Sequence, residues 1–279
     1  MTVRHDPADL FSLHGQVAVV TGGVGRLGVQ YGRTLLRAGA AIALFDIAPP
    51  GPAATELAES GAAVSIHQVD ATDRAAVDRA IGEVTARFGA PTILINNAGL
   101  GSSPGDASLE TGRFEQYPAS AWDAMIDSHL KSAFIASQSF LAAFRAAARQ
   151  SGSIVNISST YGLVSPDQSM YDALRHGGRE WFKPVGYSTA KSGMLNFTRW
   201  LAEYCGHERL GVRVNTLVPG GVREQSHTAA FVAEYERRTP LGRMARDDDY
   251  NGAILFLASP ASAYMTGATL VVDGGWTAR

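Results

Sequence analysis

The stretch VAVVTGGVGRLG, residues 17–28, joins a short β-branched run to a glycine-rich turn and the start of an amphipathic segment. Glycines in such a turn allow a sharp change of direction after a strand. They also let backbone N–H groups approach an anion at the start of the following helix. The stretch therefore predicts a strand, a phosphate-binding turn and a helix, with a plain βα turn as the alternative interpretation.

The same alternation of β-branched runs and longer Ala-rich segments continues along the chain. Strands are predicted at residues 17–20, 41–45, 63–69, 92–96, 153–158, 212–217 and 268–272, and helices at 27–38, 73–88, 120–147, 187–205 and 248–258. Strands separated by helices are typical of a parallel sheet covered on both faces. We predict one α/β domain over residues 1–279, a doubly wound parallel sheet of about seven strands.

Length, composition and charge narrow the class of protein. The 279 residues, 46% of them hydrophobic, suffice for one large core. A net charge of −2 gives no basic field for nucleic acid or anionic lipid, so we expect a small polar ligand. The single Cys205 excludes an internal disulfide, and neither a membrane span nor the apolar core of a signal peptide is recognisable. We expect a cytoplasmic protein without a metal site.

An acidic residue, Asp46, ends the second predicted strand 18 residues after Gly28. A carboxylate at that place can hydrogen-bond the adenosine ribose of a dinucleotide and repel a 2′-phosphate. The combination favours dinucleotide binding over a plain turn, and NAD over NADP. Arg26, within the turn, either faces solvent or adds charge near the phosphates and weakens that preference.

Two tyrosines between residues 171 and 191 each precede a cation by four residues, Tyr171 with Arg175 and Tyr187 with Lys191. A tyrosine works as acid or base near neutral pH only if cations favour its phenolate, and residues four apart share one helix face. Tyr187 begins a helical pattern, whereas paired glycines follow Tyr171 closely. We therefore expect Tyr187 to be the acid/base and Lys191 to lower its pKa.

Over nearly its full length the chain resembles the short-chain dehydrogenase/reductase family. The resemblance is carried in order by TGGVGRLG (21–28), VDATD (69–73), NNAG (96–99), NISS (156–159), YSTAK (187–191), RVNTLVPGGV (213–222) and VDGGW (272–276). It implies a Rossmann-like sheet, a nicotinamide cofactor and hydride transfer between an alcohol and a carbonyl. The last motif resembles relatives that assemble as homotetramers.

The resemblance implies roles for individual residues. Ser159 would bind the substrate oxygen beside Tyr187 and Lys191, or else it only caps the strand end. His129 stands where the family commonly has asparagine, and it either relays a proton or is structural. The expected cofactor contacts are Gly22, Gly25, Arg26, Leu27, Gly28, Asp46, Asp70, Ala71, Asn97, Ala98, Gly99, Tyr187, Lys191, Pro219, Gly220 and Val222.

Some of these positions keep an alternative interpretation. Asp70 would contact the adenine, or it is only a neighbour of the better helix cap, Asp73. After residue 222 the chain lacks the threonine with which many relatives bind the nicotinamide carboxamide. Gln225 or Ser226 could replace it.

The segment 162–186 separates two candidate catalytic residues by more than the spacing usual in the family. We interpret it as an inserted loop or lid at the mouth of the ligand crevice. Tyr171, Arg179 and Lys183 within it are candidate substrate contacts. The alternative is that the tyrosine only packs and that the charges face solvent.

We therefore expect an NAD-dependent oxidoreductase acting on a secondary alcohol or carbonyl of a sugar, sugar acid, polyol or nucleotide-linked sugar. The alternatives are an NADPH-dependent ketoreductase such as a 3-oxoacyl reductase, and a non-catalytic dinucleotide sensor. A sensor has little need of Ser159, Tyr187 and Lys191 together, so their presence favours an enzyme.

Overall fold

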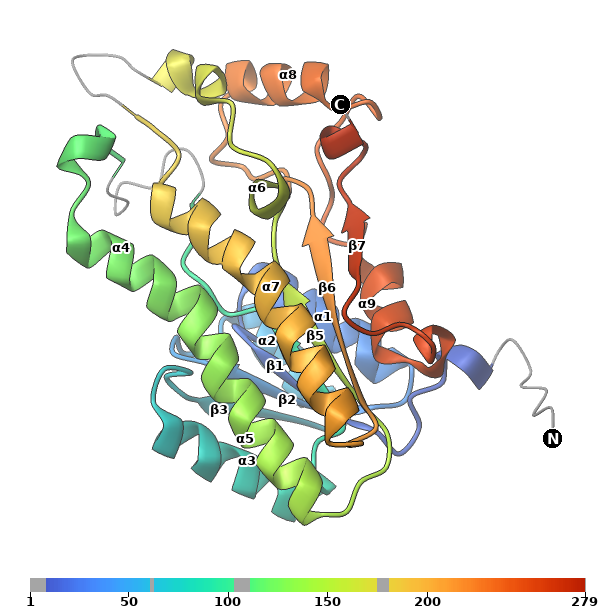
Figure 1. Ribbon diagram of the computed structural model, residues 1–279. Helices are drawn as coiled ribbons and strands as arrows, with labels where there is room; N and C mark the ends of the chain where they lie inside the picture. Colours follow the sequence, from blue (N-terminus) through green and yellow to red (C-terminus); the bar gives the residue numbers. More distant parts are fainter. Residues whose placement is uncertain (1–8, 61–62, 103–110, 175–180, 279) are drawn as a thin grey trace.

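Figure 1 shows the computed structural model, which describes residues 9–60, 63–102, 111–174 and 181–278. Seven parallel strands form one sheet in the order β3-β2-β1-β4-β5-β6-β7. The strands are β1 Val17–Thr21, β2 Ala41–Asp46, β3 Val64–Gln68, β4 Ile93–Asn96, β5 Gly152–Ile157, β6 Val212–Pro219 and β7 Thr269–Val272. The strand order reverses beside β1, which opens a ligand crevice at the carboxyl ends of the strands. The predicted Rossmann-like fold is confirmed.

Helices cover both faces of the sheet (Figure 1). One face packs against α1 Arg26–Arg37, α2 Pro52–Glu59 and α9 Asn251–Ala258. The other packs against α3 Arg74–Phe88, α5 Ser132–Ala146 and α7 Val185–His207. Both faces of the central strands are therefore buried, which explains why β1, β2 and β4 are nearly continuous apolar runs.

The central strand β1 shows how one run serves two cores. Its side chains alternate, so that Ala18 and Val20 enter the core beside α1, whereas Val17 and Val19 enter the core beside α3 and α5. All four side chains are buried. The rigid strand thus fixes the position of the glycine turn that follows it.

The predicted helix 120–147 is interrupted by a wider turn. Helix α4 Ala119–Ile126 runs into a π-helical turn, Asp127–Lys131, and then into α5. His129 lies in that turn. Such turns recur at functional sites because they redirect a side chain without ending the helix.

Other short elements surround the crevice. They are α6 Thr160–Leu163, α8 Ala229–Arg238 and the 3₁₀ helices Asp9–Phe11, Phe114–Gln116, Gln168–Leu174, Pro260–Ser262 and Trp276–Ala278. The sequence analysis predicted none of these, nor α2. In Figure 1, α8 and the 3₁₀ helix Gln168–Leu174 lie side by side beyond the carboxyl end of β6.

Within the described part of the chain, no helix has both the length and the apolar character needed to cross a membrane. The same residues contain no group of three or more His, Cys, Asp or Glu side chains arranged to hold a metal ion.

Candidate active site

A cavity of about 560 Å³ lies over the carboxyl ends of β1, β2 and β4. Ten of the residues expected to contact a cofactor line it: Gly22, Gly25, Arg26, Leu27, Asp46, Asp70, Ala71, Asn97, Ala98 and Gly99. Gly28 is absent from the lining because it supports the turn from beneath, where a Cβ would lie 2.1 Å from the carbonyl oxygen of Gly22. Gly22 itself has a φ of +61°, which favours glycine.

The Asp46 carboxylate is fixed at the edge of this cavity by two backbone amides. Its Oδ2 accepts a hydrogen bond from the N–H of Val24 at 3.1 Å, and its Oδ1 accepts one from Ala48 at 3.0 Å. Two donors restrict where the negative charge can move. A second anion placed beside it would be repelled by a carboxylate that is already oriented.

Arg26 is directed toward other loops. Its Nε forms an ion pair with Asp247 Oδ1 at 2.6 Å, and its guanidinium donates to the carbonyl oxygen of Arg223 at 2.7 Å. The side chain thus ties the start of α1 to the segment after β6. This engagement leaves less of its charge for a 2′-phosphate near Asp46.

Neighbouring polar residues keep the cavity in shape. The Asn97 side-chain amide donates to the carbonyl oxygens of Thr21 and Gly22 at 3.2 and 3.0 Å, which braces the glycine turn. Asp73 caps α3 by accepting from two backbone amides, as expected from the sequence. Asp70 accepts from the backbone and hydroxyl of Thr72, and so presents its carboxylate in a fixed position.

A second cavity, of about 280 Å³, adjoins the first, and both are lined by Leu27, Asn97, Gly99 and Leu100. The structure brings together the four candidate catalytic residues, Ser159, Tyr187, Lys191 and His129, in the walls of this second cavity. Pro219, Gly220 and Val222 line it too, as do Glu224 and His227. Gln225 and Ser226, the candidates for the carboxamide contact, do not line it.

Ser159 ends the fifth strand region and faces Tyr187 from α6. Its hydroxyl accepts a hydrogen bond from the Tyr161 amide at 3.2 Å, so it does cap α6. It also hydrogen-bonds Tyr187, whose pKa this contact lowers. The two interpretations of Ser159 are therefore compatible.

The pKa of Tyr187 is raised, because burial outweighs the hydrogen bonds from Ser159 and Ser102 that lower it. The expectation that Lys191 lowers this pKa stays a prediction, because the contacts that lower it here are those of Ser159 and Ser102. Lys191 Nζ lies 5.8 Å from the centre of the Tyr187 ring and donates to the carbonyl oxygen of Ile157 at 2.9 Å. Burial also lowers the pKa of Lys191, to about 8, so its ammonium stays mostly protonated at neutral pH.

His129 is buried beside Tyr187, and the two rings meet edge to face with 5.3 Å between their centres. Burial, and then the nearby charge of Lys191, hold the pKa of His129 well below its usual value, so its ring is neutral. Neither ring nitrogen has a hydrogen-bond partner of good geometry among the described residues. The ring fits only because Gly99 lacks a Cβ, which would lie 1.9 Å from Nδ1.

Tyr171 occupies a packed aromatic cluster. Its ring packs at a tilt against that of Trp181 with 4.4 Å between centres, and its hydroxyl lies 3.0 Å from that of Tyr161. Burial raises its pKa well above the usual value. Tyr171 therefore packs, although it also lines the second cavity.

The other two substrate candidates have different outcomes. Arg179 lies outside the described residues, as do Arg175 and the glycines that follow it. Lys183 is placed immediately before α7, and its ammonium points inward to the second cavity, where it donates to the carbonyl oxygen of Ser102. The alternative of a solvent-facing charge is therefore wrong for Lys183.

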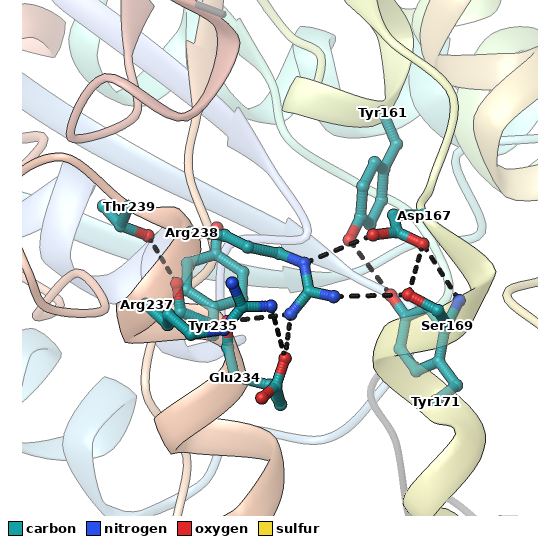
Figure 2. A network of polar contacts seen from close by, with 9 residues as sticks. All are labelled: Tyr161, Asp167, Ser169, Tyr171, Glu234, Tyr235, Arg237, Arg238 and Thr239. Atoms are coloured by element: carbon teal, nitrogen blue, oxygen red, sulfur yellow. Dashed lines mark hydrogen bonds and ion pairs between the residues drawn. The ribbon is translucent and has the colours of Figure 1, made fainter.

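Figure 2 shows how α8 is fastened to the 3₁₀ helix Gln168–Leu174. Arg238 forms ion pairs with Glu234 of its own helix and with Asp167 across the gap, the latter at 3.2 Å, and donates to the Ser169 hydroxyl. Tyr235 of the same helix accepts a hydrogen bond from the Gly221 amide at 2.6 Å. Sequence reasoning missed α8, although Phe231, Val232 and Tyr235 recur at helical spacing and are buried.

The comparisons with known proteins agree with this arrangement. The family model described as short chain dehydrogenase matches residues 16–235. The chain is 32% identical to 2-dehydro-3-deoxy-D-gluconate 5-dehydrogenase of Escherichia coli over 96% of this chain and 98% of that protein.

Solved structures give the same result. A gluconate 5-dehydrogenase from Burkholderia cenocepacia, in complex with NADP and tartrate, superposes with a TM-score of 0.82 at 29% identity, over 98% of this chain and all of that one. A short-chain dehydrogenase from Leptospira borgpetersenii with bound NAD+ gives 0.82 at 26% identity, over 99% and 98% of the two chains. The chain belongs to the short-chain dehydrogenase family and is an oxidoreductase that acts on CH–OH groups.

Proposed function

We propose that the protein is an NAD-preferring dehydrogenase that moves hydride between a nicotinamide and a secondary CH–OH group of a polar substrate. The observation that carries the proposal is the convergence of Ser159, Tyr187 and Lys191 in one cavity that opens into the groove beside Asp46. Sugars, sugar acids, polyols and nucleotide-linked sugars are the substrate classes considered.

The described residues suit a dinucleotide. The turn at Gly22 and Gly28 leaves no room for a Cβ, so backbone amides lie close to the groove where a pyrophosphate would bind. The two orphaned nitrogens of His129 offer further polar contacts at the junction of the two cavities. When bound, the nicotinamide supplies the hydride acceptor or donor.

The side chains around the substrate would then transfer the proton of its reacting hydroxyl group. Ser159 donates to the reacting oxygen and orients it, and Tyr187 takes the hydroxyl proton on oxidation or returns it on reduction. Lys191 carries the positive charge that favours the phenolate, and it holds the nicotinamide ribose. The raised pKa of Tyr187 means that this charge is needed for turnover near neutral pH.

A preference for NAD rests on the Asp46 carboxylate, which two amides hold in place, and on the engagement of Arg26 with Asp247. Titration of both cofactors by protein fluorescence tests it, and we expect tighter binding of NAD(H). Equal or tighter binding of NADP(H) would instead favour the NADPH-dependent ketoreductase, which is the second candidate because two similar structures carry NADP.

The activity itself is tested by following nicotinamide absorbance with a panel of polyols, sugars, sugar acids and ketones. Turnover of a panel member supports the proposal, whereas cofactor binding without turnover of any would favour a dinucleotide sensor. The proposal includes a homo-oligomer, by family resemblance a tetramer. The segment 162–186 as a substrate-side lid and the cytoplasmic location stay predictions.

A further inference from the structure

Lysine is used sparingly in this chain. Of 24 cationic residues only three are lysines, and arginine accounts for the rest. Lys131 is exposed and forms an ion pair with Asp127 at 3.2 Å, whereas Lys183 and Lys191 both line the cavity around Tyr187. Lys191 belongs to the family motif. Lys183, a second and partly buried lysine at the same cavity, therefore needs an explanation of its own.

Lys183 is held in a defined position. Its backbone N–H donates to the side-chain oxygen of Gln168 at 3.0 Å, which fixes the point from which the side chain emerges. Its ammonium donates to the carbonyl oxygen of Ser102 at 2.5 Å and lies 4.8 Å from the centre of the Tyr187 ring. The Tyr161 ring lies 5.4 Å from the same ammonium. The positive charge is thus placed close to the candidate acid/base.

The charge of Lys183 is poorly compensated. Lys183 is partly buried and forms no ion pair among the described residues, although an ammonium withdrawn from solvent normally has a carboxylate partner. The titratable side chains that share its cavity are Tyr161, Tyr171, Tyr187, Tyr235, Lys191, His129, His227 and Glu224. Among the described residues of that lining, Glu224 is the single carboxylate. Burial lowers the pKa of Lys183 to about 7, and Glu224 acts in the opposite direction.

We infer that Lys183 binds a carboxylate of the substrate, and that the natural substrate is therefore a hydroxy acid whose carboxylate lies near the reacting CH–OH group. The inference rests on the proposed function, because it takes Tyr187 as the group that meets the reacting hydroxyl. One small molecule can contact both groups, since the ammonium and the Tyr187 ring face the same cavity. In the free protein the ammonium donates to the neutral carbonyl oxygen of Ser102. When a substrate carboxylate binds, the ammonium would exchange this contact for a stronger hydrogen bond to a charged acceptor.

The cofactor is not the anion that Lys183 recognises. The groove lined by Gly22, Arg26 and Asp46 does not include Lys183, which instead lies on the side of Tyr161 and Ser102. The phosphates expected at the glycine turn would therefore lie in the other cavity. We therefore assign Lys183 to recognition of the substrate and not of the cofactor.

A dependence on pH follows from this assignment. The protonated form of Lys183 is disfavoured in the free protein and favoured by a bound carboxylate, so binding at a pH above about 7 takes up a proton. Affinity for a hydroxy acid should fall by up to about tenfold per pH unit above that value, until the pKa in the complex is reached. Affinity for the matching polyol should lack this step.

The test uses matched substrates, D-gluconate with D-glucitol and 3-hydroxybutyrate with 1,3-butanediol, which differ in a carboxylate. Lys183→Met should raise KM for the acids by about 10- to 100-fold and leave KM for the neutral partners within about twofold. Lys183→Arg, whose charge does not titrate, should bind acids without the pH step. Lys131→Met is the control for removing a lysine charge, and it should match the wild type.

Calorimetry separates this inference from the proposed function, because it needs no turnover. Binding of D-gluconate to the NAD complex at pH 8, measured in buffers of different ionisation enthalpy, should show proton uptake in the wild type and none in Lys183→Met. If Lys183→Met raises KM for the acid and the neutral member of each pair by the same factor, or leaves acid binding unchanged, Lys183 does not recognise a carboxylate. If wild-type protein binds acids with proton uptake but oxidises none of the panel, the inference holds and the proposed function fails.

Discussion

His129 is buried, its ring is neutral, and neither ring nitrogen has a hydrogen-bond partner of good geometry among the described residues. Its ring contacts that of Tyr187 edge to face. A group in that state suits a bound water or a ribose hydroxyl, as the asparagine common in the family would. The contact with Gly99 restricts the ring to one position. The role of His129 as a proton-relay partner stays a prediction.

We predict that His129→Asn keeps kcat within about tenfold, because an amide supplies both a donor and an acceptor in similar space. His129→Leu removes both and should lower kcat by about 10²-fold, the lower end of what a proton-transfer group contributes. Steady-state rates at saturating substrate measure the difference. Equal rates for the two variants, at equal Tm, would mean that His129 is structural.

The sequence predicted the positions of some site residues and not of others, depending on whether their surroundings are set by neighbouring residues in the chain. Ser159, Tyr187 and Lys191 could be predicted since each belongs to a short motif that the next element presents in one way. The inward position of Lys183 could not be predicted, because its contacts are with Ser102 and Tyr161. Both residues lie well before it in the chain, so the local sequence gives no sign of these contacts. From sequence alone, a charged residue in a loop-like segment is expected to be exposed, because the segments that cover it are not known.

At the scale of elements, the strands were predicted well because the central strands β1, β2, β4 and β5 are buried on both faces and mostly apolar. The elements that border the substrate side were not. Helix α8 is short and highly charged, and the 3₁₀ helix Gln168–Leu174 lacks any apolar period. Their positions depend on contacts between the two, above all those of Arg238 with Asp167 and Ser169.

The contacts of Arg238 with Asp167 and Ser169 give a prediction about α8. Arg238→Met should raise KM several-fold, because the helix that holds Tyr235 against Gly221 is no longer fastened to its neighbour. Since the ion pairs are partly exposed, Tm should fall only by about 2–4 °C. Kinetics and thermal unfolding together check both effects.

Arg237 provides the control for the α8 variant. It is 65% exposed at the side chain and pairs with Glu234 at 3.0 Å on the same helix. Arg237→Met removes a comparable charge without touching Asp167. An equal rise in KM for the two variants would contradict the role given to the Arg238 contacts.

At the scale of the whole molecule, α5 and α7 present an exposed aromatic face. Trp200 is 63% exposed, Phe134 46% and Tyr204 37%, and the Trp200 and Tyr204 rings stack with 5.6 Å between centres. All three line one shallow cavity between the helices. A second copy of the chain is the expected cover for this face, in line with the proposed homo-oligomer.

We predict that Trp200→Glu shifts the protein to a smaller assembly, because a charge in a covered apolar contact remains unpaired. Size-exclusion chromatography with light scattering measures the mass in multiples of the 29.5 kDa chain. Tyr264→Ser changes a separate aromatic residue that is even more exposed, and it should leave the mass unaltered. A wild-type monomer would contradict the oligomer proposal.

The central claim concerns the whole site, namely that the chain transfers hydride with Tyr187 as acid/base while Tyr171 packs in the aromatic cluster. The most direct test compares kcat of Tyr187→Phe and Tyr171→Phe on one substrate, with NAD binding measured in parallel. We expect Tyr187→Phe to lose about 10²- to 10⁴-fold in kcat with cofactor affinity kept, and Tyr171→Phe to stay within about tenfold. The reverse order of the two variants, or undiminished turnover by Tyr187→Phe, would contradict the account.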